Sequence, residues 1–230
     1  MIKKAMILAA GFGKRLLPLT LKNPKPLLKI GNETLLSNTI KFLQLSGIEE
    51  VVINTHYLEK QIVNYINKKK FNLKINIIKE KKILDTGGGV LNAIDNFKNK
   101  PFLVINPDTI WNLHYIKELK LMEKKYLKKK CCLLLVNKKK SFDKNFLGDF
   151  ELKVNLIKNT KNNKNNFIYT GLQIINPNVF SNEDIKFFSI KKVWDRLIEK
   201  KELYGMESNI NFLHVSNLKI YKILKKKFIF

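Results

Sequence analysis

The residues best suited to chemistry are glycines and cations that follow the first apolar run of the chain. Residues 5–10, AMILAA, predict a buried strand. Gly11, Gly13 and Arg15 follow at once, and Lys25 comes shortly after them. Glycine lets backbone N–H groups turn towards a ligand and approach it closely, which makes a concave anion site. The stretch therefore predicts a binding site for phosphate groups.

Two better-known phosphate-binding motifs do not fit this stretch. A P-loop has Ser or Thr after its Gly-Lys pair, but here Arg15 follows Lys14, and Leu8 stands where its first glycine belongs. The dinucleotide motif GxGxxG fails because its third glycine falls on Leu16. A glycine-rich turn on a lysine-rich protein remains the alternative.

Residues 11–28, GFGKRLLPLTLKNPKPLL, carry a more specific pattern. They resemble the signature GxGxRLxPLTxxxPKPLL of the sugar nucleotidyltransferases, also called NDP-sugar pyrophosphorylases. The resemblance implies that a nucleoside triphosphate and a sugar 1-phosphate give an NDP-sugar and pyrophosphate. It also implies that Arg15 and Lys25 are catalytic. The nucleotide contacts that it implies here are Leu8, Ala10, Gly11 and Gly13.

A second glycine run, DTGGG at 85–89, comes before a predicted helix at 90–97. Glycines at a helix start offer free N–H groups to a ligand. The run resembles the ETGGG of family members that make UDP-N-acetylmuramic acid, which implies nucleotide binding by Asp85, Gly87 and Gly88. A flexible turn is the alternative.

Asp108 stands just beyond residues 101–106, PFLVIN, which predict a buried strand. A carboxylate there suits Mg²⁺, which keeps waters and takes phosphate oxygens. The family usually has a glycine before this aspartate, whereas this chain has Pro107. The resemblance implies that Asp108 is catalytic and binds metal, and that Asn106 contacts the sugar. A helix-capping role for Asp108 is the alternative.

Residues 211–217, NFLHVSN, resemble the WxDVGT motif, in which the aspartate is the second metal ligand. Here that position is His214, and Ser216 and Asn217 replace Gly-Thr. Imidazole suits softer metals than Mg²⁺. His214 could ligate Mn²⁺ or contact a phosphate or a metal-bound water, or the site could use Asp108 alone. An ordinary histidine at a strand end stays open.

Two further positions point to the sugar. Residues 148–150, GDF, resemble the GDF turn of the N-acetylmuramate subgroup, which implies sugar binding by Asp149; a hairpin aspartate is the alternative. Gly171 interrupts a predicted strand at 167–175 and marks a bulge or the close approach of a ligand. The resemblance implies that Gly171 also faces the sugar.

The order of predicted elements indicates the fold class. Strands at 5–10, 50–54 and 73–77 alternate with helices at 35–45 and 57–66, which is typical of a parallel α/β sheet. We expect a doubly wound, Rossmann-like and mostly parallel sheet of the nucleotide-diphospho-sugar transferase type. The prediction is a single domain, residues 1–230. We expect residues 1–136 to form the nucleotide-binding half and residues 137–230 the sugar-binding half.

The composition excludes few classes of protein. Lys and Arg total 44 against 19 Asp and Glu, a net charge of +25, but the lysines are scattered and Arg15 and Arg196 are the only arginines. We therefore attribute the charge to composition bias and expect no specific nucleic-acid partner. We also expect no membrane span and no signal peptide. The adjacent Cys131 and Cys132 predict buried thiols and a cytoplasmic location.

Together these features predict a sugar-1-phosphate nucleotidyltransferase that uses Mg²⁺ or Mn²⁺. The subgroup resemblance implies UTP and N-acetylmuramic acid α-1-phosphate as substrates, as in cell-wall recycling. A guanylyltransferase acting on mannose 1-phosphate or a heptose phosphate is the alternative enzyme. A non-catalytic subunit that binds a nucleotide sugar is a further alternative, because Pro107 and His214 depart from the family pattern.

Overall fold

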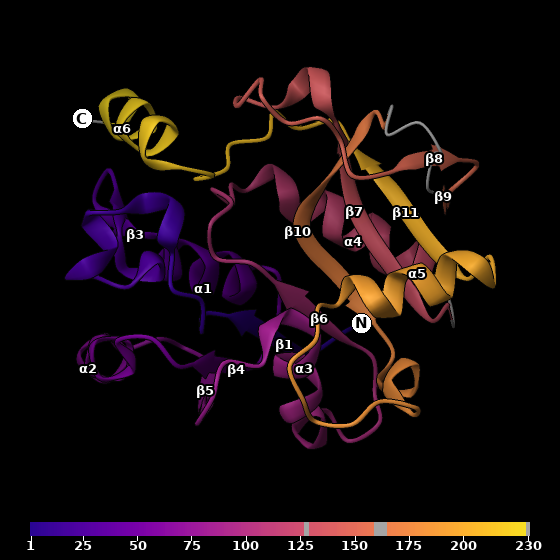
Figure 1. Cartoon of the computed structure of the whole chain (residues 1–230), viewed down its shortest axis with the longest axis horizontal. Coiled ribbons are helices and arrows are strands. Elements are labelled where there is room, and N and C mark those ends of the chain that lie inside the picture. The colour runs from indigo at the N-terminus through magenta and orange to yellow at the C-terminus, as the bar shows by residue number, and fades with distance from the viewer. Residues whose placement is uncertain (127–128, 159–164, 229–230) are drawn as a thin grey trace.

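The computed structural model describes residues 1–126, 129–158 and 165–228. Within these residues, nine strands form one sheet in the order β5–β4–β1–β6–β10–β7–β11–β9–β8, and two short strands pair separately. Figure 1 shows the sheet running through the middle of the molecule with helices around it. The expected α/β class is confirmed.

The four strands of the sheet that come first in the sequence pair with one another in parallel. β1 (Lys4–Leu8) lies between β4 (Glu50–Thr55) and β6 (Phe102–Ile105). β4 also pairs with β5 (Lys74–Lys79) in parallel. Because parallel strands end at the same edge, the segments that follow these strands come together there, where open α/β sheets bind ligands.

β10 (Phe167–Ile175) runs against this direction and joins the second half of the sheet to the first. It pairs antiparallel with β6 and with β7 (Cys131–Asn137). Its register with β7 shifts between Tyr169 and Gln173, and Gly171 within that interval has a φ of +91°. The bulge predicted at this glycine is therefore confirmed, and it lies beside the end of β6.

Helices cover both faces of the sheet, as expected for a doubly wound fold. Successive strand residues point to opposite faces. Ala5 packs in a buried cluster with residues of α1 (Leu35–Leu45) and α4 (His114–Tyr126). Met6 packs in a second cluster with residues of α5 (Lys191–Glu199). The core is therefore two apolar layers, one on each side of the sheet.

The C-terminal helix lies against the N-terminal loop region, although the two are far apart in sequence. α6 (Leu218–Lys227) packs Tyr221 and Leu224 in one cluster with Leu16 and Leu28 (Figure 1). None of the helices in the described part of the chain is long and apolar enough to cross a membrane. The remaining regular elements are α2 (Glu59–Lys68), β2 (Lys29–Ile30), β3 (Glu33–Thr34), β8 (Glu151–Lys153), β9 (Leu156–Lys158) and β11 (Leu203–Ser208).

The second glycine run differs from its prediction. We expected the glycines to precede a helix at 90–97, but α3 (Asp85–Asn92) includes all three of them. The amides of Gly87 and Gly88 donate to the carbonyl of Phe188, at 2.9 and 3.1 Å. The expectation of free amides here is therefore corrected: a neighbouring loop satisfies these orphan donors of the helix start. The ligand-binding role of the two glycines stays a prediction.

This packing leaves no room for a side chain on α3. A Cβ atom built on Gly88 would lie 2.0 Å from the carbonyl oxygen of Lys186, which is backbone and cannot move aside freely. We expect Gly88→Ala to lower the free energy of unfolding by about 3 kcal/mol in urea titrations, because of overpacking. The control is Gly47→Ala, which meets no atom within 4 Å but carries a φ of +86°, and should cost about 1 kcal/mol. A smaller loss for Gly88→Ala than for the control would contradict this packing.

Candidate active site

The first glycine loop begins where β1 ends and folds into three short 3-10 turns, η1 (Lys14–Leu16), η2 (Leu19–Leu21) and η3 (Lys25–Leu27). Gly13 has a φ of +64°, and a Cβ there would lie 2.9 Å from Cγ2 of Thr20. Thr20 also donates its hydroxyl to the Gly13 carbonyl, at 3.0 Å. Only glycine suits this turn, which brings Lys25 back beside the loop.

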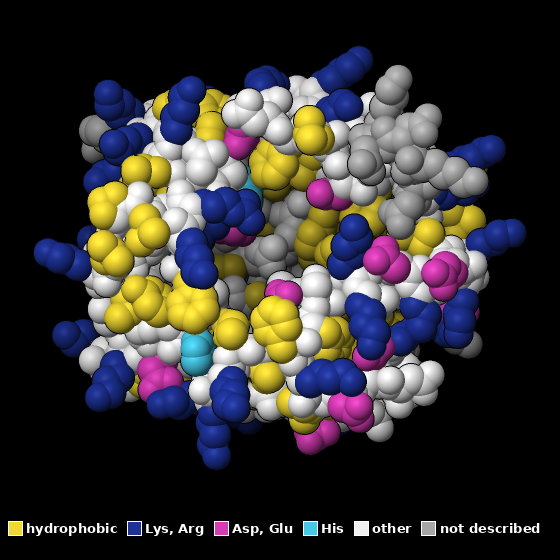
Figure 2. Space-filling model, viewed as in Figure 1, with side chains coloured by type: hydrophobic (Ala, Val, Ile, Leu, Met, Phe, Trp, Pro, Cys, Tyr) yellow, Lys and Arg dark blue, Asp and Glu magenta, His cyan; other side chains and the backbone are white. Residues whose placement is uncertain are grey.

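A cavity of about 840 Å³ opens at the edge where β1 and β6 end. Figure 2 shows the corresponding hollow near the middle of this face, with cationic and acidic side chains around it. The structure brings most of the predicted residues to its walls. These are Leu8, Ala10, Gly11, Gly13, Arg15, Lys25, Asp85, Asn106, Asp108, Asp149, Gly171 and His214. Gly87 and Gly88 do not line the cavity and lie buried behind Thr86.

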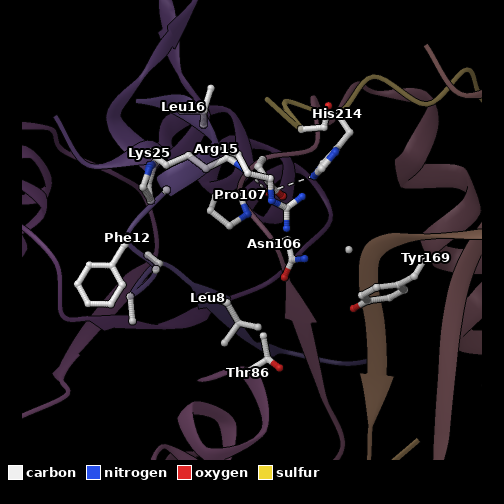
Figure 3. A pocket seen from close by; sticks show the side chains of 18 of the residues that line it. Leu8, Phe12, Arg15, Leu16, Lys25, Thr86, Asn106, Pro107, Tyr169 and His214 are labelled. Carbon is white, nitrogen blue, oxygen red and sulfur yellow. Dashed lines mark hydrogen bonds and ion pairs between the residues drawn. The ribbon is translucent and has the colours of Figure 1, made fainter. Parts of the chain in front are cut away.

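Asp108 is the centre of the charged contacts in this cavity. Lys25 Nζ donates to Asp108 Oδ2 at 2.5 Å, and His214 Nε2 lies 3.1 Å from the same oxygen (Figure 3). Burial alone would raise the pKa of Asp108, but the Lys25 ammonium and His214 outweigh it and hold that pKa well below its usual range. The carboxylate is therefore ionised across the physiological pH range.

Backbone pairing sets the position of His214. The N–H of Val215 donates to the carbonyl of Asp108 at 2.8 Å, and Thr109 and His214 form an antiparallel bridge. The Ser-Asn pair that follows also has a structural partner. Ser216 donates its hydroxyl to the buried Asp143 at 2.5 Å, and the Asn217 side chain caps α6 by accepting from the Ile220 N–H. No pattern in the sequence indicates this role for Asp143.

The Asp108–His214 pair fits a divalent cation that keeps part of its own shell. Asp108 Oδ1 and His214 Nδ1 are buried and have no hydrogen-bond partner in the part of the chain that the structure describes. Among the described residues, no three Asp, Glu, His or Cys side chains gather into a ligand set. Such a site suits a cation that takes its other ligands from water and substrate phosphates. Asp108 and His214 are the residues that would hold it.

Arg15 and the glycine loop line the cavity beside Asp108, at the edge where β1 and β6 end. The guanidinium group of Arg15 points into the cavity, as Figure 3 shows. The Cβ position of Gly11 has no atom within 4 Å, so the loop leaves open space there. Cationic side chains and an open glycine backbone therefore share one wall.

The opposite wall comes from β10 and the turn before β8. The N–H of Asn106 donates to the carbonyl of Gly171 at 2.8 Å, and a Cβ on Gly171 would lie 2.9 Å from Cβ of Asn106. Asp149 Oδ2 accepts from the N–H of Tyr169 at 2.8 Å. Desolvation raises the pKa of Asp149, while this hydrogen bond and His214 partly offset the rise. Asn106, Asp149 and Gly171 thus form one connected wall.

Sequence reasoning missed the aromatic residues of this wall. The hydroxyl of Tyr169 is buried and has no hydrogen-bond partner among the described residues, and Figure 3 shows its ring at the side of the cavity. Phe146, Phe187 and Phe212 also line the cavity. An aromatic residue two positions before a strand glycine was the available signal for Tyr169, but the same pattern is typical of core strands.

Known proteins resemble this chain in sequence and in fold. The chain is 31% identical over 212 residues to mannose-1-phosphate guanyltransferase of Saccharomyces cerevisiae, covering 89% of this chain but only 58% of that protein. It is 26% identical over 223 residues to N-acetylmuramate alpha-1-phosphate uridylyltransferase of Caulobacter vibrioides, covering 94% and 92%. HddC from Yersinia pseudotuberculosis, solved with GMP-PN, shares the fold with a TM-score of 0.79 at 21% identity, over 99% of this chain and 100% of HddC.

The family assignment rests on a longer match. Residues 4–144, more than half of the chain, match the pattern of the family described as Nucleotidyl transferase. This region holds the glycine loop, Lys25 and Asp108. The chain therefore belongs to the nucleotidyl transferase family.

Proposed function

We propose that this protein transfers a nucleotidyl group from a nucleoside triphosphate to a sugar 1-phosphate and releases pyrophosphate. One observation carries the proposal: Arg15, Lys25 and Asp108 converge on one cavity beside an open glycine loop. Positive charge and backbone amides suit a polyphosphate, and a carboxylate among them suits a cation that a polyphosphate brings. The match to the Nucleotidyl transferase family supports the same chemistry.

The reaction asks for positioning and charge neutralisation rather than for a general base. The attacking group is an oxygen of the sugar phosphate, which is already ionised at neutral pH. The amides of Gly11 and Gly13 and the Arg15 guanidinium would hold the departing pyrophosphate. Lys25 would hold the attacking phosphate or the α-phosphate in line. When the cation is bound at Asp108 and His214, it supplies charge neutralisation at the α-phosphate.

The two walls of the cavity divide the substrate between them. We assign the base and ribose to the end lined by Leu8, Ala10 and Asp85, in the half formed by residues 1–136. We assign the sugar to the end lined by Asn106, Asp149 and Gly171, which residues from 137 onward help to form. Gly87 and Gly88 shape the first end from behind, since their amides bond to Phe188.

For the substrates, we propose UTP and N-acetylmuramic acid α-1-phosphate. The DTGGG run at 85–89 and the GDF turn at 148–150 resemble the N-acetylmuramate subgroup, and the Caulobacter uridylyltransferase is 26% identical to this chain over 223 residues. The aromatic rings of Phe146 and Phe212, which line the cavity beside His214, suit the apolar parts of acetyl and lactyl groups. A cytoplasmic location fits two buried free cysteines and the supply of nucleoside triphosphates.

Guanylyl transfer to mannose 1-phosphate or a heptose phosphate is the second candidate. The 31% identity to the yeast guanyltransferase exceeds the identity to the uridylyltransferase, and the structural neighbour from Yersinia was solved with a guanine nucleotide. A regulatory subunit without turnover is the third. The contact between Lys25 and Asp108 favours an enzyme, because a protein that only binds a nucleotide sugar needs no such pair.

A substrate panel distinguishes these candidates. Purified protein is incubated with each of UTP, GTP, CTP and dTTP against several sugar 1-phosphates, in Mg²⁺ and in Mn²⁺, and pyrophosphate release is measured. We expect the highest kcat/KM for UTP with N-acetylmuramic acid α-1-phosphate. A preference for GTP with mannose 1-phosphate would replace the uridylyl assignment. Binding of a nucleotide without release of pyrophosphate from any pair would favour the regulatory reading.

Removing one charge from the centre should remove most turnover. We expect Lys25→Met and Asp108→Asn each to lower kcat by about 10²–10³, as the loss of one preorganised charge does in other enzymes. The free energy of unfolding is measured in parallel to show that both variants fold. Lys22→Met, an exposed lysine of the same loop, is the matched control and should keep wild-type kinetics. Near-normal turnover in either site variant would refute its role.

His214 should determine which metal the site prefers. We expect EDTA to abolish turnover and His214→Asp to increase the affinity for Mg²⁺ relative to Mn²⁺, because a carboxylate is the harder ligand. Binding of each metal in the presence of the nucleotide is measured by titration calorimetry, separately from activity. Unchanged affinities for both metals would show that His214 does not ligate the cation.

A further inference from the structure

Two polar side chains are buried between the glycine loop and α3, away from the charged centre. Asn54, in β4, is 3% exposed, and Glu80, just after β5, is 2% exposed. Burying a carboxylate costs free energy unless its oxygens are well satisfied. The hydrogen-bond partners of the Glu80 carboxylate in the described part of the chain are neutral N–H groups. A buried charge of this kind calls for an explanation.

The pair connects the end of β1, where the glycine loop begins, to the start of α3 through three hydrogen bonds. Asn54 Oδ1 accepts from the Ala9 N–H at 2.9 Å. Asn54 Nδ2 donates to Glu80 Oε1 at 2.6 Å, and Glu80 Oε2 accepts from the Leu84 N–H at 3.0 Å. Ala9 comes directly before the residues of the glycine loop, and Leu84 comes directly before Asp85. The backbone before the glycine loop is thus bonded to Asn54, and the backbone before α3 is bonded to Glu80.

The helix α3 also packs directly on this pair. A Cβ on Gly89 would lie 2.8 Å from both Asn54 Nδ2 and Glu80 Oε1. Only a residue without a side chain lets α3 approach so closely. Figure 3 shows Leu8, from the end of β1, and Thr86, from α3, next to each other at the side of the cavity. The length of the Asn54–Glu80 bridge therefore sets the distance between the glycine loop and the start of α3.

The side-chain types of the pair match its hydrogen bonds. A carboxylate can accept two N–H groups, one on each oxygen, whereas a glutamine amide can accept with its oxygen only. Asn54 must accept at one end and donate at the other, which an aspartate cannot do. Glu80 therefore supplies the two acceptors that the bridge needs, one for each N–H group.

We infer that Asn54 and Glu80 are positioning residues that hold the glycine loop and the start of α3 at the spacing a nucleotide needs. The inference rests on the proposed function, in which the glycine loop and the start of α3 bind the nucleotide. The pair contacts no reacting group, so it affects nucleotide affinity only through the positions of the glycine loop and α3. The sugar end of the cavity lies on other elements and should not depend on it.

A reciprocal exchange tests the pair. Asn54→Asp places two carboxylates against each other, and Glu80→Gln leaves one N–H without an acceptor. Each single variant should weaken the binding of UTP, or of GTP if the wild type prefers it, by about tenfold or more, as the loss of a hydrogen bond to a charged group does. The double variant Asn54→Asp, Glu80→Gln restores all three bonds at the same net charge. It should bind the nucleotide within about threefold of wild type.

Two readouts separate positioning from general stability. We expect the KM of the nucleotide to rise in the single variants while the KM of the sugar phosphate and kcat change less than about threefold. Gly47→Ala, which destabilises the fold far from the pair, should leave nucleotide affinity unchanged. Glu80→Asp keeps the charge and both acceptors but shortens the bridge by one methylene, so it should also raise the nucleotide KM.

The outcomes that overturn the inference are distinct from failure of the proposed function. Nucleotide affinity is measured by direct titration as well as by kinetics, so it is defined even if wild type shows no turnover, which would refute the function alone. Wild-type affinity in both single variants overturns the inference, as does a folded double variant that binds as weakly as the singles. If the singles do not fold, wild-type affinity in Glu80→Asp overturns it.

Discussion

The contact between Lys25 and Asp108 depends on the whole architecture of this site. It joins a turn of the first loop to the residue that follows β6, and His214 approaches the same carboxylate oxygen. Removing this carboxylate from water costs free energy, but these partners offset that cost and hold the pKa of Asp108 well below its usual range. Because one oxygen of Asp108 is left without a partner in the described residues, the same group can still meet a cation. The contacts of Asp108 provide charge balance, and cation binding by the same side chain is our proposal.

The fold supplies this contact through the shared edge of its parallel strands. β1 and β6 end side by side, which places the glycine loop next to Asp108. The antiparallel β10 then brings Gly171 against Asn106, so that a second wall faces the first. The Asn54–Glu80 bridge ties the loop to α3 from behind. Each wall is therefore held by backbone pairing or by a buried side chain rather than by surface contacts.

Sequence patterns predicted the parts of this structure in which local signals and tertiary packing agree. The helix at 35–45 and the strand at 167–175 were predicted with their observed bounds, because their apolar periods are clear. The start of α3 was not, since glycine disfavours helix and only packing against Phe188 reverses that preference. The resemblance to the sugar nucleotidyltransferases assigned Lys25 and Asp108 to one site, but an aromatic residue in a strand, such as Tyr169, gives no signal that separates a pocket wall from a core.

We propose that a sugar phosphate attacks the α-phosphate of a nucleotide held in this cavity. ³¹P NMR of one reaction mixture of protein, UTP, N-acetylmuramic acid α-1-phosphate and Mg²⁺ tests it most directly, because every phosphorus atom is followed at once. We expect the signal of the sugar phosphate to disappear, while the signals of the NDP-sugar diphosphate and of pyrophosphate grow in equal amounts. Release of inorganic phosphate or UMP while the sugar phosphate signal stays constant would contradict it, since water would then be the attacking group.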